Sequence, residues 1–223
     1  MPEYQVLRVF CSDDGSGGNP LAVFLDGASV APAQRQDAAR RIGFSETAFL
    51  DDPAAGTVRI FTPAVELPFA GHPLVGTAWL LARRGAPPQS LRPPAGEVPA
   101  RSEGERAWVV GRPEWTPPFE FAQLGSAAEV EALDGPPGGH DLIGAWAWID
   151  EQAGALRERV FPLRLGIAED EATGAAAVAL CARLGRPITI HQGRRSVIDA
   201  RPLDDGTVEI GGRVADDGPR SLD

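Results

Sequence analysis

The strongest constraint on the fold is a long apolar segment that occurs twice. Its first copy, residues 70–85, reads AGHPLVGTAWLLARRG and has no charged side chain between residues 74 and 82. A surface that is apolar on all sides predicts a helix buried inside the protein. Pro73 suits the first helical turn, where its missing N–H costs nothing, and a glycine follows the last turn. We therefore expect a central helix over residues 72–84.

The second copy lies 100 positions later and has the same arrangement. Residues 172–185 read ATGAAAVALCARLG, which predicts a second central helix over residues 172–184. In each copy a strand with an Arg-x-Phe core precedes the helix. The matching pairs are Arg59/Arg159, Phe61/Phe161, Leu80/Leu180, Ala82/Ala182, Arg83/Arg183 and Gly85/Gly185. Two units are too few for a solenoid, so the repeat predicts two pseudo-symmetric lobes.

Turn residues set the expected domain organisation. The 26 glycines and 21 prolines suit many turns between short strands. The Pro/Gly-rich stretch at residues 92–101 marks the boundary between an N-terminal lobe, residues 1–95, and a shortened C-terminal lobe, residues 96–223. A last strand at 208–210 closes the second lobe. Asp216 and Asp217 are expected in a solvated turn near the tail.

The overall composition restricts the function classes. A chain of 223 residues that is 43% apolar can build a real core in one large or two small domains. Its net charge of −10 argues against a nucleic-acid partner and against anionic membrane surfaces. No apolar run approaches the length of about 18 residues that spans a membrane, and the N-terminus lacks a signal-peptide pattern. Two cysteines without a CxxC pair make a reduced, cytoplasmic chain the expectation.

One acidic residue lies within an otherwise apolar strand pattern. In FSETAFL, residues 44–50, Glu46 shares a strand face with Phe44, Ala48 and Leu50. A carboxyl among apolar side chains has a raised pKa and can act as an acid or a base. From the pattern alone, a solvated strand edge or a cap explains Glu46 more simply.

The start of the first central helix combines features of an anion site. Gly71 lets the backbone approach a ligand closely. The free N–H groups of the first turn attract an anion, and His72 places a titratable group beside them. The sequence therefore predicts an anion-binding position next to a histidine.

Three stretches carry a resemblance to a known family. SETAFL at 45–50, FTPAVELPFAGHPLVGTA at 61–78 and GIAEDEATGAAA at 166–177 resemble the signature stretches of the PhzF family, the phenazine biosynthesis-like proteins. GNPLAVFLDG near the start and VEIGGRV near the end also fit. The match is dense over residues 1–100 and again from about 157 to 215, and thin between.

The resemblance implies a fold like that of diaminopimelate epimerase. This is an α+β fold of two pseudo-symmetric lobes, each a β-barrel-like sheet around a central helix, with the active site in the cleft between them. The two helix starts would offer N–H groups to a substrate carboxylate. The substrate-binding residues implied at these helix starts are Gly71, Pro73, Thr173, Gly174 and Ala175. Members are commonly homodimers and need no metal or organic cofactor.

The family's best understood chemistry is the isomerisation of a dihydro-hydroxyanthranilate, in which a proton leaves one carbon and one is regained elsewhere. By resemblance Glu46 moves the proton, His72 is its partner acid or relay, and Asp170 joins the site from the second lobe. A carbon-bound proton is weakly acidic, so its base must lie within reach and away from bulk water. The implied partner is a small carboxylate-bearing substrate, without nucleic acid or membrane.

Departures from the family pattern leave alternatives open. Ala175 stands where the family usually has serine, Glu171 where it usually has proline, and the second lobe is short. A non-catalytic small-molecule-binding homologue is therefore an alternative. Another is an amino-acid racemase or epimerase, which uses a thiol at each central helix start. Cys181 lies about 13 Å along its helix at 1.5 Å per residue, and Cys11 lies in a strand or turn, which disfavours that alternative.

Overall fold

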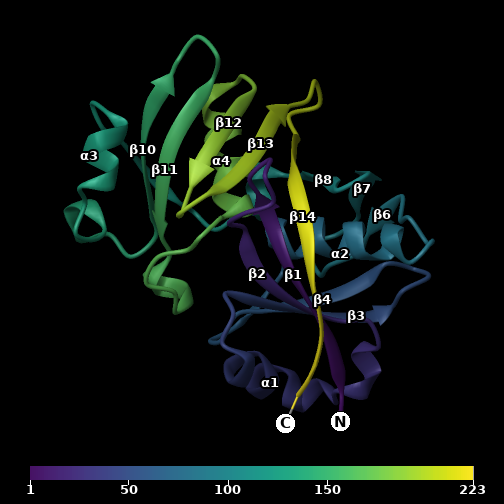
Figure 1. The fold of residues 1–223 in the computed structure, drawn as a ribbon. Coiled ribbons are helices and arrows are strands. Elements are labelled where there is room, and N and C mark those ends of the chain that lie inside the picture. Colours follow the sequence, from purple (N-terminus) through teal and green to yellow (C-terminus); the bar gives the residue numbers. More distant parts are fainter. Residues whose placement is uncertain (223) are drawn as a thin grey trace.

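The computed structural model describes residues 1–222 as a 14-stranded mixed sheet that curves around two helices, with two shorter helices at the periphery (Figure 1). The strands are β1 (Glu3–Cys11), β2 (Asn19–Phe24), β3 (Glu46–Asp52), β4 (Thr57–Phe61), β5 (Glu66–Leu67), β6 (Ser90–Leu91), β7 (Val98–Glu103), β8 (Arg106–Gly111), β9 (Glu120–Gln123), β10 (Ile143–Asp150), β11 (Ala155–Phe161), β12 (Ile188–Gln192), β13 (Ser196–Pro202) and β14 (Val208–Ser221). The α-helices are α1 (Arg35–Ile42), α2 (Gly71–Arg83), α3 (Ala127–Glu131) and α4 (Gly174–Leu184). The α+β class is confirmed, and the two expected central helices are α2 and α4, with each end within two residues of the expected one.

The internal repeat is visible in the order and direction of the strands. The sheet runs β5-β4-β3-β2-β1-β14-β13-β12-β11-β10-β9, and β8 links β7 and β6 to β14. In the first half, β3 pairs in parallel with β2 and antiparallel with β4. In the second half, β10 pairs in parallel with β9 and antiparallel with β11. The strands that carry Phe61 and Phe161 therefore occupy equivalent positions, which explains why their sequences match.

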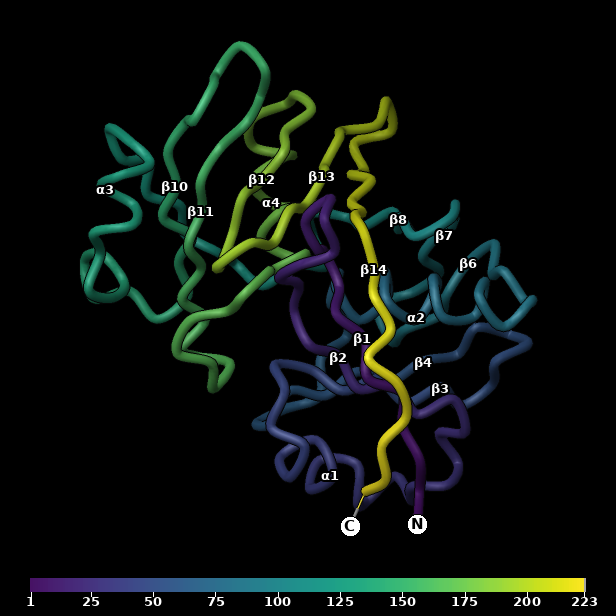
Figure 2. The backbone as a smooth tube through the Cα atoms, viewed as in Figure 1, coloured from purple at the N-terminus to yellow at the C-terminus, as the bar shows by residue number. Residues whose placement is uncertain are grey.

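Contacts cross the expected boundary at residue 95. Strands β7 and β8, which follow it, pack against α2, and β1 pairs along nearly its whole length with residues 213–221 of β14. The two chain ends lie side by side (Figure 2), where the N–H of Leu222 donates to the carbonyl of Pro2 at 2.9 Å. The division into lobes at residues 1–95 and 96–223 stays a prediction.

The last strand is longer than the sequence predicted. The strand expected at 208–210 is the beginning of β14, which continues to Ser221. The turn predicted for Asp216 and Asp217 was wrong, because both lie in this strand, whereas their predicted exposure to solvent is confirmed. Asp216 accepts a hydrogen bond from Gln5, and Asp217 accepts one from Arg8 at 3.0 Å. Pairing with β1, rather than the weak strand propensity of ADDGPRS, forms this part of the sheet.

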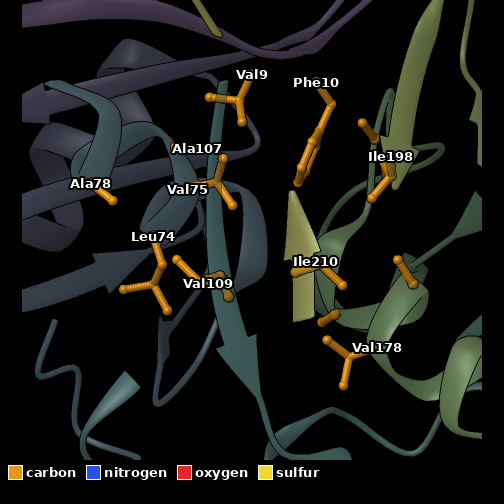
Figure 3. Close-up of a cluster of buried hydrophobic side chains, with 14 of the residues drawn as sticks. Val9, Phe10, Leu74, Val75, Ala78, Ala107, Val109, Val178, Ile198 and Ile210 are labelled. Carbon is orange, nitrogen blue, oxygen red and sulfur yellow. The ribbon is translucent and has the colours of Figure 1, made fainter. Parts of the chain in front are cut away.

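The main core joins side chains from both central helices. Figure 3 shows Leu74 and Val75 of α2 on one side of the cluster, with Val178 of α4 and Ile210 of β14 on the other. Every residue of α2 from Gly71 to Leu81 is buried. This explains the absence of charge along the helix, since each buried Leu or Val side chain contributes about 1.5–3 kcal/mol.

Glu158 of β11 is a buried carboxyl outside the cluster of predicted catalytic residues. It is fully buried, and within residues 1–222 neither of its side-chain oxygens has a hydrogen-bond partner. Burial raises its pKa to about 8, against a small opposing effect of Arg157. Gly144 on β10 makes room for it, because a Cβ there would lie 2.6 Å from Oε1 of Glu158. Glu158 is therefore neutral in the folded protein at neutral pH.

Glu158→Met is expected to raise the free energy of unfolding by about 1–3 kcal/mol near pH 8, because it removes an unpartnered buried polar group. Between the ordinary pKa of 4.5 and the raised pKa of about 8, the folded state holds a proton that the unfolded state releases. This group therefore lowers stability as pH rises through that range. Urea unfolding of both proteins at pH 5 and pH 8 measures the difference.

Glu158→Gln is the matched control, because it keeps the shape and cannot ionise. It should lose the same pH dependence while gaining less stability than Glu158→Met. An equal fall in stability between pH 5 and pH 8 in all three proteins would contradict the assignment.

Candidate active site

Glu46 stands at the start of β3, where the strand reaches the core. The predicted alternation is confirmed, since Ala48 and Leu50 belong to the main core and Phe49 belongs to a second cluster on the opposite face. Glu46 itself is only 7% exposed, so the expectation of a solvated edge, which the pattern alone favoured, was wrong. Its neighbour across the sheet is Leu21 of β2.

The two central helices meet at their first residues. A Cβ on Gly71 would lie 2.8 Å from Cα of Gly174, and a Cβ on Gly174 would lie 2.9 Å from the backbone nitrogen of His72. Only glycine allows two backbones to pack this closely. Neither helix start has a side-chain cap, so the first-turn N–H groups of both helices are available to an anion.

The structure brings Glu46, His72 and Asp170 to the wall of one cavity, together with four of the five predicted binding residues. These four are Gly71, Thr173, Gly174 and Ala175, whereas the cavity lining does not include Pro73, which lies within α2. The cavity measures about 20 Å³, which is room for about one water molecule.

The remaining wall of the cavity is apolar. It is formed by Leu67, Phe69, Ala70, Pro117, Phe119, Pro162, Leu165 and Ile167. Sequence reasoning identified none of these eight as site residues. Those at 67, 69, 70 and 167 lie in the signature stretches, whereas those at 117, 119, 162 and 165 come from connections whose approach to the site depends on the fold. An apolar wall excludes water and strengthens electrostatic interactions at the three polar side chains.

Burial controls the charges of the site. It raises the pKa of Glu46 to about 7, against the opposing effect of the Ser45 hydroxyl. It lowers the pKa of His72 to about 4, although the charge of Asp170 and the carbonyl of Pro20 favour protonation. It raises the pKa of Asp170 to about 7, and the charge of Glu46 adds to this rise. Near neutral pH the histidine is uncharged, and the two carboxyls share about one proton.

The positions of these groups suit proton transfer. Nδ1 of His72 lies 3.2 Å from Oε2 of Glu46, and both side chains are buried. Within residues 1–222, Oε2 of Glu46 and Nε2 of His72 have no hydrogen-bond partner. Buried polar atoms normally have partners, so these two point to a ligand that would supply them.

Asp170 has partners that the sequence analysis did not identify. Asn19 of β2 donates Nδ2 to Oδ1 of Asp170 at 2.7 Å, and the Thr173 hydroxyl donates to Oδ2 at 2.7 Å. Gln192 of β12 contacts Thr173 through both ends of its amide. Asn19 lies in the GNP stretch that resembled the family, which was a usable signal, whereas Gln192 had none.

The two cysteines lie away from the cavity. Cys181 is near the end of α4, with its sulfur 3.5 Å from the carbonyl of Arg186, and burial raises its pKa to about 12. Burial also raises the pKa of Cys11. Neither residue lines the cavity. A mechanism with a thiolate at each helix start has no support in this arrangement.

Residues 1–222 were also compared with the requirements of a metal site and of a membrane-spanning helix. Within residues 1–222, no group of three or more His, Cys, Asp or Glu side chains is arranged to hold a metal ion. Among the same residues, no helix has the length and apolar character needed to cross a membrane.

Comparison with known proteins identifies the family. The sequence model of the family described as "Phenazine biosynthesis-like protein" (PhzC-PhzF) matches residues 7–133. Trans-2,3-dihydro-3-hydroxyanthranilate isomerase of Pseudomonas fluorescens is 32% identical over 240 residues, covering 86% of each chain. The solved structure of a predicted epimerase from Pseudomonas aeruginosa has a TM-score of 0.76 at 28% identity and covers 100% of this chain and 99% of its own.

A more distant structure completes the comparison. A probable proline racemase from Agrobacterium radiobacter has a TM-score of 0.69 at 12% identity and covers 100% of this chain and 93% of its own. This likeness concerns the fold alone, and it agrees with the expected diaminopimelate epimerase-like architecture. The curated homologues that match over most of their length are isomerases, and the enzyme class of the chain is accordingly isomerase. The chain belongs to the phenazine biosynthesis-like (PhzC-PhzF) family.

Proposed function

We propose that the chain moves a carbon-bound proton by acid/base catalysis on a small carboxylate-bearing substrate that resembles dihydro-hydroxyanthranilate. The observation that carries this proposal is Glu46, a buried carboxyl with an unpartnered oxygen in a water-poor cavity. A group that takes a proton from carbon and returns it works best when its pKa lies near the working pH, and burial raises the pKa of Glu46 to about 7.

Each part of the site has a role in this proposal. The open N-termini of α2 and α4 bind the substrate carboxylate, and the contact of Gly71 with Gly174 holds these two helix starts together at the cavity. Glu46 takes the proton from one carbon and returns it to another. His72 enters as the neutral imidazole, so it acts by relaying a proton or by donating a hydrogen bond, and Asp170 supplies negative charge from the second lobe.

The small volume of the cavity restricts how a substrate can enter. Ligand pockets measure about 300 Å³ or more, far above the 20 Å³ of this cavity. Its walls must therefore separate to admit a substrate and close again around it. Closure brings the apolar side chains against the substrate and keeps the transferred proton from exchanging with bulk water.

The test follows the proton itself. The protein is incubated with trans-2,3-dihydro-3-hydroxyanthranilate in D₂O, and the ring protons are followed by NMR. We expect isomerisation with deuterium uptake at a ring carbon. A folded protein that leaves the ring protons unchanged would remove this substrate from the proposal.

The non-catalytic alternative predicts a different pair of results. A binding homologue would bind a carboxylate ligand, as measured by calorimetry, without exchanging any carbon-bound proton. The alanine at position 175 and the short second lobe favour this alternative, whereas the grouping of Glu46, His72 and Asp170 favours catalysis. A homodimer in the cytoplasm, which the family resemblance implies, remains part of the same proposal.

A further inference from the structure

Asp170 is held by side chains from both halves of the chain. Asn19, 151 positions earlier, donates to Oδ1, and Thr173 donates to Oδ2. Asp170 is 3% exposed, so both bonds form away from water, where hydrogen bonds to a charged group are strong. Both carboxylate oxygens therefore have a donor.

Backbone groups fix the direction of each bond in this network. The carbonyl of Ala172 can only accept, so the Asn19 group 3.0 Å from it is the amide nitrogen. The N–H of Thr173 can only donate, so the Gln192 group 3.0 Å from it is the amide oxygen. Nε2 of Gln192 then faces the Thr173 hydroxyl at 2.9 Å. Because that hydroxyl accepts from Gln192, its own proton goes to Asp170.

Glu46 has no comparable set of donors. The nearby Ser45 hydroxyl has one proton, and it lies 3.0 Å from Oδ1 of Asn19. Since Nδ2 of Asn19 faces Asp170 and Ala172, the atom that faces Ser45 is the amide oxygen, which can only accept a hydrogen bond. The single proton of Ser45 therefore has two competing acceptors, Asn19 and Glu46, and Oε2 of Glu46 has no partner within residues 1–222.

The other charged groups around Asp170 do not reverse the difference in hydrogen-bond donors between Asp170 and Glu46. Across the cavity lie Glu46 and His72, and burial keeps the histidine neutral at neutral pH. On its other side Asp170 borders a surface pocket of about 620 Å³, whose charged residues are Glu131, Glu169, Glu171, Arg157, Arg159 and Arg194. Arg157 and Arg159 are already paired with carboxylates there. Repulsion between Glu46 and Asp170 is reciprocal, so the order in which they ionise depends on the hydrogen-bond donors.

We propose that Asn19 and Gln192 are positioning residues for Asp170. Asn19 acts on it directly, and Gln192 acts through Thr173. Together they keep Asp170 as the charged carboxylate and leave the shared proton of the site on Glu46. This proton placement concerns the free protein, and its catalytic meaning rests on the proposed function. A fixed negative charge beside Glu46 makes it a stronger base once it has lost its proton. Thr173, expected to bind substrate, uses its only hydroxyl proton to hold Asp170.

Carboxyl ¹³C NMR of the ligand-free protein, labelled at the side chains of Asp and Glu, reads the proton placement without a substrate. Glu46→Gln and Asp170→Asn assign the two signals. We expect Asp170 to ionise at lower pH than Glu46 in the unmodified protein. The reverse order would overturn the proposal.

Three variants test the donors themselves. Thr173→Val replaces the hydroxyl by a methyl group, Gln192→Leu releases the hydroxyl, and Asn19→Ala removes the other donor. Thr173→Val and Asn19→Ala should raise the midpoint of Asp170 by about one pH unit, the size expected for a lost hydrogen bond to a charged group, and lower that of Glu46. Gln192→Leu should shift both midpoints in the same directions. Thr173→Ser keeps the hydroxyl and should keep both midpoints.

Two outcomes separate this proposal from loss of fold and from failure of the proposed function. If Asn19→Ala does not fold, the pair Thr173→Val and Thr173→Ser decides, and equal titrations in that pair would overturn the proposal. If the proposed substrate is wrong, deuterium exchange is absent while the ionisation order in the free protein stays as stated. In an active enzyme, Thr173→Val should also move the pH midpoint of kcat/KM downward, which a loss of packing alone would not do.

Discussion

Glu46→Gln is expected to slow proton exchange at the substrate carbon by about 10²–10⁴-fold, the contribution typical of a positioned acid or base. The amide keeps the size of the carboxyl and cannot take up a proton. Because the side chain is buried at the start of β3, no solvent-exposed carboxyl can replace it. The measurement is deuterium incorporation from D₂O by NMR, together with ligand affinity by calorimetry, which we expect to change little.

A matched control separates this effect from a general loss of negative charge. Glu97→Gln removes a carboxylate that is exposed and paired with Arg92, away from the cavity, and should leave the exchange rate unchanged. The wild-type kcat/KM should rise with pH and level off above about pH 7, because proton abstraction needs the ionised form of Glu46, whose pKa burial raises to about 7. A Glu46→Gln protein that retains a tenth or more of the rate would contradict the assignment of Glu46 as the base.

Gly174→Ala is expected to lower both the free energy of unfolding and the rate of proton exchange. The added Cβ would lie 2.8 Å from Cα of Gly71 and 2.9 Å from the nitrogen of His72, so the two helix starts must move apart. Overpacking of this kind costs about 1–3 kcal/mol of unfolding free energy. Displacing His72 and the anion-binding N–H groups by a fraction of an ångström or more should lower the rate by up to about 10²-fold.

Chemical unfolding and the exchange assay measure these two effects in the same variant. Gly135→Ala is the control, since a Cβ at Gly135 meets nothing within 4 Å and its backbone does not need glycine. Gly71→Ala should behave like Gly174→Ala, because its Cβ would lie 2.5 Å from Cδ1 of Ile210 and 2.8 Å from Cα of Gly174. Wild-type stability and rate in both variants would show that the helix starts are not in contact in solution.

The two effects have different physical origins and should be separable. Glu46→Gln removes a proton-transfer group without changing the backbone, so its effect falls on the chemical step. Gly174→Ala changes the distance between two helices, so it alters anion binding, the position of His72 and stability together. If the Gly174→Ala protein binds ligand normally but exchanges the carbon-bound proton slowly, the substitution acts on the rate through the position of His72 and not through anion binding.

The sequence by itself determined the parts of this protein that depend on local pattern. The repeat and the uncharged runs at residues 74–82 and 172–182 predicted α2 and α4, because an apolar surface on all sides of a helix has to be buried. The alternation in SETAFL put Glu46 on the same strand face as Ala48 and Leu50, but the pattern alone did not establish that Glu46 is buried. The signature stretches indicated the family and directed attention to Glu46, His72 and Asp170.

Only the tertiary structure decided how these residues interact. The pKa values near 7 arise from burial by segments far apart in the chain, and no local pattern measures that loss of water. The bonds from Asn19 and Thr173 to Asp170 depend on which donors come within 2.7 Å, and the sequence separation of 151 positions in the first gives no indication of this. The contact of Gly71 with Gly174 and the long pairing of β14 with β1 likewise depend on how segments far apart in the chain meet in space. Hydrogen bonds, desolvation and backbone packing act over a few ångströms, so they are fixed only when the chain has folded.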